Sequence, residues 1–92
     1  MFTLISYDVP AERTRIFHKI LSRYLMRLQF SVFCGDLRQS DYLKLLKDLK
    51  SARTTDDRLM ILRTANRRNI EMEIHHDDIE ESYESHIRGM VL

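Results

Sequence analysis

Asp8 is the residue whose type and position most directly suggest a chemical role. It ends the stretch "LISYDVP", where an apolar run meets the only proline of the chain. A carboxylate here could accept N–H groups from the first turn of a following helix. It could equally be a hard oxygen ligand for Mg²⁺, which takes one or two protein carboxylates and completes its shell with water and phosphate. One carboxylate makes a poor site, whereas two across a dimer axis would suffice.

A series of basic residues follows Asp8 in the sequence. Steps of four separate Arg15, Lys19, Arg23 and Arg27, and Arg13 stands just before them. Acids that would pair with them at i,i+4 positions are missing from this series. Regular Lys/Arg spacing without base-reading aromatic residues predicts contacts to phosphates, which position a duplex without reading its sequence. The structural alternative is a solvated helix face.

Two further groups of residues carry weaker signals. The motif "HHDD" spans residues 75–78, but neighbours on a strand point to opposite faces, so His75 and His76 are not expected to hold one ion. Cys34 is the only cysteine, and no histidine motif is placed to activate it. We therefore expect a buried thiol, no intrachain disulfide and a cytoplasmic location.

Hydrophobic periodicity indicates the elements that position these residues. Strands are expected at Phe2–Tyr7, 28–34, 58–64 and 70–75. Helices are expected at 11–26 and at 40–51, the second with Ser40 as its N-cap. The tail from Asp77 has a weak helical pattern formed by Ile79, Tyr83, Ile87 and Met90.

The segment "LQFSVFCG" alternates like a single strand. One face would carry Leu28, Phe30, Val32 and Cys34, and the other Gln29, Ser31 and Phe33. In that arrangement Ser31 could offer its hydroxyl to a phosphate or a water in the same cleft as Asp8. The alternative for Ser31 and Phe33 is a half-buried sheet face without a chemical role.

These elements predict an α+β fold, a ferredoxin-like sandwich. The expected sheet is rich in antiparallel pairs and has four strands, with room for a fifth at the C-terminus and two helices on one face. The 92 residues predict one domain, residues 1–92, and so short a chain gains from burying a second surface in an oligomer. No apolar run is long enough to span a bilayer, and no signal peptide is recognisable, so no membrane association is expected.

The charge is distributed unevenly along the chain. Residues 11–53 contain ten Lys/Arg and four acids, whereas residues 54–92 contain five Lys/Arg and nine acids. A basic first half and an acidic tail suggest a polyanion as the partner of one face.

The pair "YD" at Tyr7 and Asp8, followed by "QFSVFCGDL" at 29–37, resembles the CRISPR-associated Cas-two (Cas2) family. The matching positions are Gln29, Ser31, Val32, Phe33, Gly35 and Leu37. The resemblance implies a homodimer in which Asp8 of each protomer lies near the axis and one Mg²⁺ is shared between them. Tyr7, Ser31 and Phe33 then become candidate catalytic residues beside Asp8.

The resemblance also implies a choice of functions. Some members are metal-dependent nucleases on RNA or DNA, and others bridge subunits of the Cas-one (Cas1) integrase on protospacer duplex DNA during spacer acquisition. The acidic, helix-like tail departs from the family's usual C-terminal strand, which pairs with the partner subunit. A ferredoxin-like toxin ribonuclease of the virulence-associated D type, which also begins with "YD", is the alternative, although the motif "SVF-x-G-x-L" favours Cas2.

Overall fold

The computed structural model describes residues 1–77 and 79–91, with side chains through Arg88. Its elements, in chain order, are β1 Phe2–Asp8, η1 Ala11–Arg13, α1 Thr14–Ser22, β2 Met26–Gln29, β3 Val32–Asp36, α2 Gln39–Ala52, β4 Arg58–Thr64, η2 Arg67–Asn69, β5 Glu73–His76, β6 Ile79–Ser82 and α3 Tyr83–Val91. None of the helices in these two ranges has the length and apolar character that a bilayer crossing requires.

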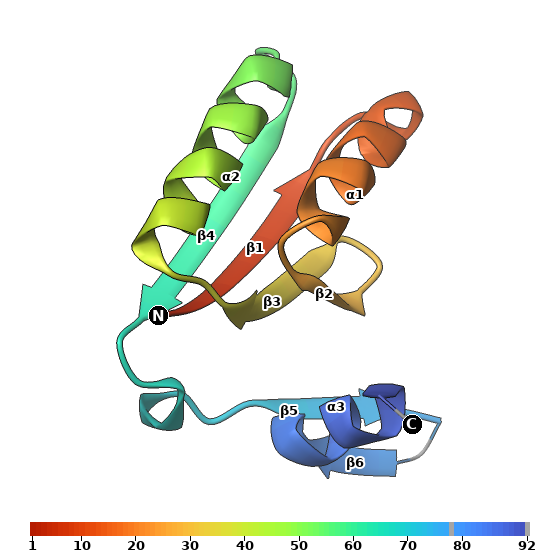
Figure 1. Ribbon diagram of the computed structural model, residues 1–92. Coiled ribbons are helices and arrows are strands. Elements are labelled where there is room, and N and C mark those ends of the chain that lie inside the picture. Colours follow the sequence, from red (N-terminus) through yellow and green to blue (C-terminus); the bar gives the residue numbers. More distant parts are fainter. Residues whose placement is uncertain (78, 92) are drawn as a thin grey trace.

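The first six regular elements form the predicted ferredoxin-like sandwich. Four antiparallel strands pair in the order β2-β3-β1-β4, and β5 and β6 form a separate hairpin. Helices α1 and α2 lie on one side of the sheet, and the C-terminal segment of β5, β6 and α3 lies on the other (Figure 1). The fold class is thereby confirmed, while the last strand pair stands outside the main sheet.

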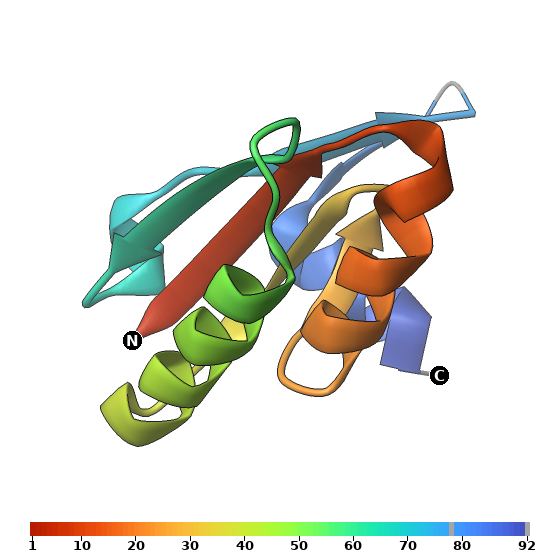
Figure 2. The ribbon, with the colours of Figure 1, turned by 90° about the horizontal axis from the view of Figure 1, so that it is seen from above.

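The helix-covered face of the sheet holds the larger apolar core. Alternate residues of β1 and β3 point to this side and meet the apolar stripes of both helices. The most buried members are Ile5, Phe17, Leu21, Phe33 and Leu45. From above, the two helices lie side by side over the strands (Figure 2). This packing fixes the position of β1, which carries Asp8 at its end.

The second face is closed only in part, by the C-terminal segment. Phe2, Leu28 and Cys34 of the sheet pack there against Ile74 and Tyr83. The Cys34 thiol lies 3.5 Å from the hydroxyl of Tyr83, and burial raises the pKa of that thiol. Cys34 is thus the buried, free thiol that the sequence predicts.

Arg67 attaches the C-terminal segment further. Its guanidinium lies 4.3 Å from the ring centroid of Tyr83 and 5.5 Å from that of Phe2. It also forms an ion pair with Glu84 at 3.4 Å. One cation therefore contacts both the sheet and α3, which holds this segment against the N-terminal end of β1.

The prediction of one strand over residues 28–34 is wrong. β2 ends at Gln29 and β3 begins at Val32, so Phe30 and Ser31 form the turn of a hairpin. Phe30 is 69% exposed instead of facing inward with Leu28. The physical reason is that the chain reverses after Gln29 and pairs with itself, which adds a strand to the sheet edge.

Other boundaries also differ from the predicted ones, and the strand expected at 70–75 is β5, Glu73–His76. The helix expected to reach residue 26 ends at Ser22, because the chain must turn to enter β2. Arg38, not Ser40, is the N-cap of α2. The tail forms β6 before α3, so its helical pattern begins only at Tyr83, and the side chain of Met90 lies outside the described residues.

Candidate metal and nucleic-acid site

Asp8 lies at the exposed end of β1, on the sheet face that the helices do not cover. It stands opposite Arg58 of β4, and no hydrogen bond or ion pair of its carboxylate occurs among the described residues. The helix-cap interpretation is wrong, because Pro10 occupies the N-cap of η1 and Arg13 that of α1, and neither end has a side-chain cap. The carboxylate is therefore available to a ligand.

Tyr7 occupies the opposite face from Asp8 and is only 4% exposed. Its hydroxyl donates to the carbonyl of Phe30 at 3.2 Å, and its amide donates to the carbonyl of Ser31 at 3.1 Å. Burial raises the pKa of Tyr7, although Arg27 nearby opposes the shift. Tyr7 thus anchors the β2–β3 turn next to Asp8, which is a positioning role.

The structure separates the two residues predicted to share a face of the second strand. Ser31 is half-buried in the turn and lies at the Asp8 end of the sheet through its bond to Tyr7. Phe33 is fully buried, with its ring 6.4 Å from that of Tyr7 and 5.5 Å from that of His18. Phe33 therefore belongs to the core under the helices and lines no cleft with Ser31.

The donor at Asp8 fits Mg²⁺ in chemistry, whereas one chain supplies too few ligands. A carboxylate is the oxygen ligand that this ion prefers. Among the described residues, Asp8 belongs to no group of three or more side chains that could share an ion. A site built on Asp8 consequently needs a carboxylate from a second chain, and the uncovered face is where such a chain could approach.

The predicted basic residues fall into two groups. Arg15, Lys19, Arg23 and Arg27 are exposed. Arg13 instead contacts both carboxylate oxygens of Asp57, with the shortest distance at 2.8 Å, and donates to the carbonyl of Ala52 at 2.7 Å. This pairing lowers the pKa of Asp57 to about 2. Arg13 thus links η1 to the loop before β4 through these contacts. Its predicted role in phosphate binding is corrected to this structural one.

Arg15 and Arg27 line the same hollow although they lie on different elements. Arg27 belongs to β2, not to the helix, and its guanidinium lies 5.0 Å from the ring centroid of Phe30. A hollow of about 250 Å³ beside the turn is lined by Tyr7, Thr14, Arg15, His18, Arg27 and Phe30. Two arginines thereby border one concave surface beside Tyr7, on the helix-covered side of the sheet. The predicted helical stripe missed this grouping, because only the hairpin creates it.

The histidines of "HHDD" point to opposite sides of β5, as predicted. His75 contacts Glu73 at 3.0 Å, and His76 contacts Glu81 at 2.8 Å. Asp78 lies outside the described residues. His86, which contacts the same oxygen of Glu81, was not anticipated from the sequence, because it comes from α3.

Comparison with known proteins assigns the family. The family description "CRISPR associated protein Cas2" matches residues 1–72. The chain belongs to this family, which gives it a CRISPR-associated function and does not favour the toxin alternative. The match ends before β5, so the hairpin and α3 lie beyond it.

Individual relatives agree with this assignment. A protein of Haloferax volcanii named CRISPR-associated endoribonuclease Cas2 is 36% identical over 66 residues, which cover 72% of this chain and 77% of that protein. One of the same name from Methanosarcina acetivorans is 38% identical over 50 residues, covering 54% and 58%.

Solved structures agree as well. A Cas2 crystal structure superimposes with a TM-score of 0.76 at 32% identity, covering 85% of this chain and 88% of that one. The crystal structure of Streptococcus pyogenes Cas2 superimposes with a TM-score of 0.65 at 25% sequence identity, covering 78% of this chain and 98% of that one.

Proposed function

We propose that this protein is a metal-dependent endoribonuclease that acts as a homodimer, with the Asp8 carboxylates of both protomers holding one Mg²⁺. The observation that carries the proposal is the position of Asp8, exposed and without a partner among the described residues, at the open end of the second sheet face. The names of the Haloferax and Methanosarcina relatives support RNA as the substrate.

The surface around Asp8 supports the dimer. Met60 and Leu62 of β4 are 60% and 40% exposed, and they stand opposite Ser6 and Leu4 on the same face as Asp8. Large apolar side chains side by side on a sheet are typical of an interface. A two-fold axis through this face would bury them and place two copies of Asp8 near each other.

The residues of this chain would have different roles at such a site. The bound Mg²⁺ would activate water and offset the charge on the scissile phosphate. Asp8 would hold the ion, and Arg15 and Arg27 would hold flanking phosphates through charge-assisted hydrogen bonds. Tyr7 fixes the turn that carries Ser31 and so keeps the edges of the site in place.

An RNA cleavage assay with Mg²⁺ or a chelator tests this proposal. Asp8→Asn keeps the shape of the side chain and removes its charge, so cleavage should disappear, as it should with the chelator. Asp36→Asn is the matched control, because Asp36 is an exposed acid at the opposite end of the same sheet. Full activity of the Asp8→Asn protein would contradict the proposal.

A second function is favoured by the exposed basic residues. We propose that Arg15, Lys19 and Arg23 bind duplex DNA along its backbone, and that the dimer bridges Cas1 integrase subunits in the cytoplasm during spacer acquisition. These three side chains form no ion pair with the described residues. Removing them should weaken binding equally for unrelated sequences and reduce the salt slope by about 0.9 for each lost phosphate contact.

The matched control for DNA binding lies on the other helix. Lys44, Lys47 and Lys50 are exposed on α2, and their triple replacement by glutamine removes the same charge. The Arg15, Lys19 and Arg23 triple variant should lose DNA binding, and the α2 variant should keep most of it. Equal loss in both would show attraction by net charge alone. A pulldown on the immobilised protein, with Cas1 and with or without a short DNA duplex, tests the bridge. The bridge requires that Cas1 and the duplex be retained together.

A further inference from the structure

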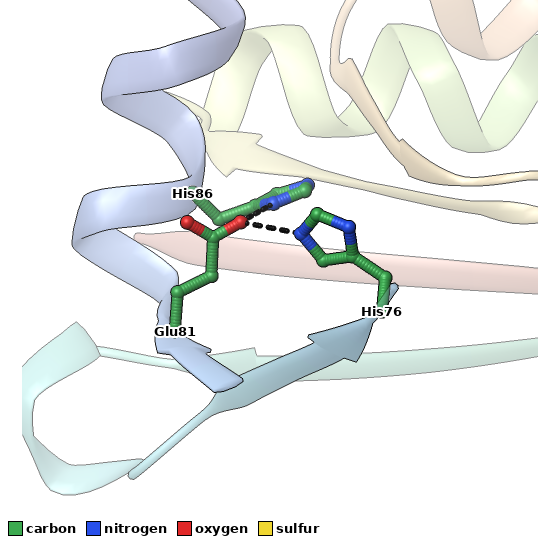
Figure 3. Close-up of side chains that lie close together, drawn as sticks. All are labelled: His76, Glu81 and His86. Carbon is green, nitrogen blue, oxygen red and sulfur yellow. Dashed lines mark hydrogen bonds and ion pairs between the residues drawn. The ribbon is translucent and has the colours of Figure 1, made fainter. Parts of the chain in front are cut away.

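We propose that His76, Glu81 and His86 form a binding site for a transition-metal ion, with Zn²⁺ as the expected ligand, separate from Asp8. The Nε2 atom of His76 lies 2.8 Å from Oε1 of Glu81, and Nδ1 of His86 lies 2.7 Å from the same oxygen (Figure 3). These potential ligand atoms all lie within 4.8 Å of one another. Two imidazoles and one carboxylate are a donor set that binds Zn²⁺ and leaves a fourth position for water.

The three side chains come from three consecutive elements. His76 ends β5, Glu81 lies on β6, and His86 lies on the first turns of α3. The planes of the two imidazole rings are inclined by 73°, and their centroids lie 5.6 Å apart. One nitrogen of each ring points toward Glu81 (Figure 3). An ion at this point would join the hairpin to the helix that follows it.

This cluster is less exposed to water than an ordinary surface cluster, which favours metal binding. His76, Glu81 and His86 are 41%, 26% and 18% exposed, so the cluster is partly shielded from water. Without metal, Glu81 accepts a hydrogen bond from each ring, and these two bonds lower the pKa of Glu81. The bond to Glu81, and then that to Asp77, raises the pKa of His76. Metal–ligand bonds of about 2.0–2.2 Å would replace both hydrogen bonds after the ligand atoms separate by a few tenths of an ångström.

Asp77 supplies an outer contact. Its carboxylate lies 3.5 Å from Nδ1 of His76, which is the ring nitrogen that would not bind the ion. A carboxylate on the far nitrogen orients a metal-binding imidazole and raises its basicity. Because Asp77 is 91% exposed, the Asp77→Asn variant measures how much this contact contributes.

The opposite side of the same hairpin provides a built-in comparison. Glu73, His75 and Glu80 also lie close together, but they are 53%, 56% and 74% exposed and contain a single imidazole. Fewer nitrogen ligands and greater hydration make this cluster the poorer Zn²⁺ site. His75 therefore serves as the control for His76, its neighbour on β5.

A bound ion would stabilise the segment that closes part of the second sheet face. Tyr83, at the start of α3, packs on Phe2 with ring centroids 5.8 Å apart, three residues before His86. Because metal binds the folded segment, it should stabilise this packing by mass action. The proposal concerns the C-terminal segment alone and does not depend on the nuclease function.

Zinc titration of the untagged, chelator-treated full chain tests the site, in competition with a chromophoric chelator. The wild type should bind one Zn²⁺ per chain, and Co²⁺ in its place should show visible tetrahedral absorption. His76→Asn, Glu81→Gln and His86→Asn should each weaken binding by more than about 100-fold, and Asp77→Asn by about 10–100-fold. His75→Asn should leave affinity and stoichiometry unchanged.

Several results would overturn the proposal. One is a wild-type chain that does not bind Zn²⁺ in competition with the chelator. Another is loss of binding in the His75→Asn protein, which would place the ion elsewhere. Circular dichroism of each metal-free variant checks its folding, and the wild-type titration decides the question even where a variant does not fold.

Discussion

The two faces of β1 have different surroundings although their residues alternate along one strand. Ile5 and Tyr7 point to the helices and are almost completely buried there. Leu4, Ser6 and Asp8 point to the other side, where the C-terminal segment covers Leu4 and exposure then increases toward Asp8. One face is therefore closed along its length, and the other is closed at one end only.

This difference separates residues with structural roles from the residues of the proposed site. On the closed face, packing accounts for the aromatic residues, including Phe33 and Tyr7, which the sequence placed among the catalytic candidates. On the half-open face, Asp8 has no ion pair or hydrogen bond among the described residues, and the exposed side chains of Met60 and Leu62 lie on the same face. A second chain and a metal ion are expected to bind at that open end.

Phe33→Ala should give the largest effect and tests the closed face. The ring is fully buried, so its removal leaves a cavity and should cost about 3–5 kcal/mol of unfolding free energy. Urea denaturation measures the loss, and Phe33→Leu should show a smaller one if the alanine variant is unfolded. Phe30→Ala, at the exposed turn position, should change stability by no more than about 0.5 kcal/mol. Similar losses at both positions would contradict the assignment of Phe33 to the core.

Met60→Glu should give the next largest effect and tests the open face. Charge placed in an apolar interface remains unpaired, so we expect the dimer to weaken by at least about 2 kcal/mol. Sedimentation velocity across a concentration series measures the shift toward monomer. Leu43→Glu is the control, because Leu43 is 55% exposed on α2 and far from this face. A dimer unaffected by Met60→Glu would move the interface elsewhere.

The Arg13–Asp57 pair should give a smaller, pH-dependent effect on the closed side. Asp57 has its pKa lowered from 3.8 to about 2, chiefly by its hydrogen bonds to Arg13. A carboxyl whose pKa is lowered in the folded state stabilises the fold at pH values above its ordinary pKa. This contribution is lost as the pH falls through about 2. Between pH 4 and about 2, urea midpoints of the wild type should therefore fall more than those of Asp57→Asn. Asp56→Asn, its exposed neighbour, should follow the wild type.

The sequence predicted the fold class and most buried positions for a clear physical reason. Phe2–Tyr7 and residues 58–64 have strand composition and clear boundaries, and both are strands in the structure. The sequence did not indicate the hairpin turn at Phe30 and Ser31, because a two-residue turn leaves the alternation of apolar residues intact. Leu28 and Cys34 were thus assigned to one face correctly, although the chain reverses between them.

The candidate sites were predictable only where neighbours in sequence create them. Asp8 is the last residue of its strand, so its place at a sheet end could be predicted from the sequence. Arg15 and Arg27 come together through the unanticipated hairpin, and Glu81 and His86 meet His76 through a turn and a helix start. Spacings of five residues match neither strand nor helix periodicity, so nothing in the sequence indicated that cluster.

Calorimetric titration of the dimer with Mg²⁺, together with thermal unfolding, tests the central claim most directly. Two facing carboxylates repel each other without metal, so Asp8→Asn should fold and dimerise at least as well as the wild type in a chelator. Mg²⁺ should bind the wild type at one ion per dimer and raise its Tm by mass action, and it should do neither in Asp8→Asn. Equal Mg²⁺ binding and equal Tm shifts in both proteins would contradict the claim that paired Asp8 residues hold the ion.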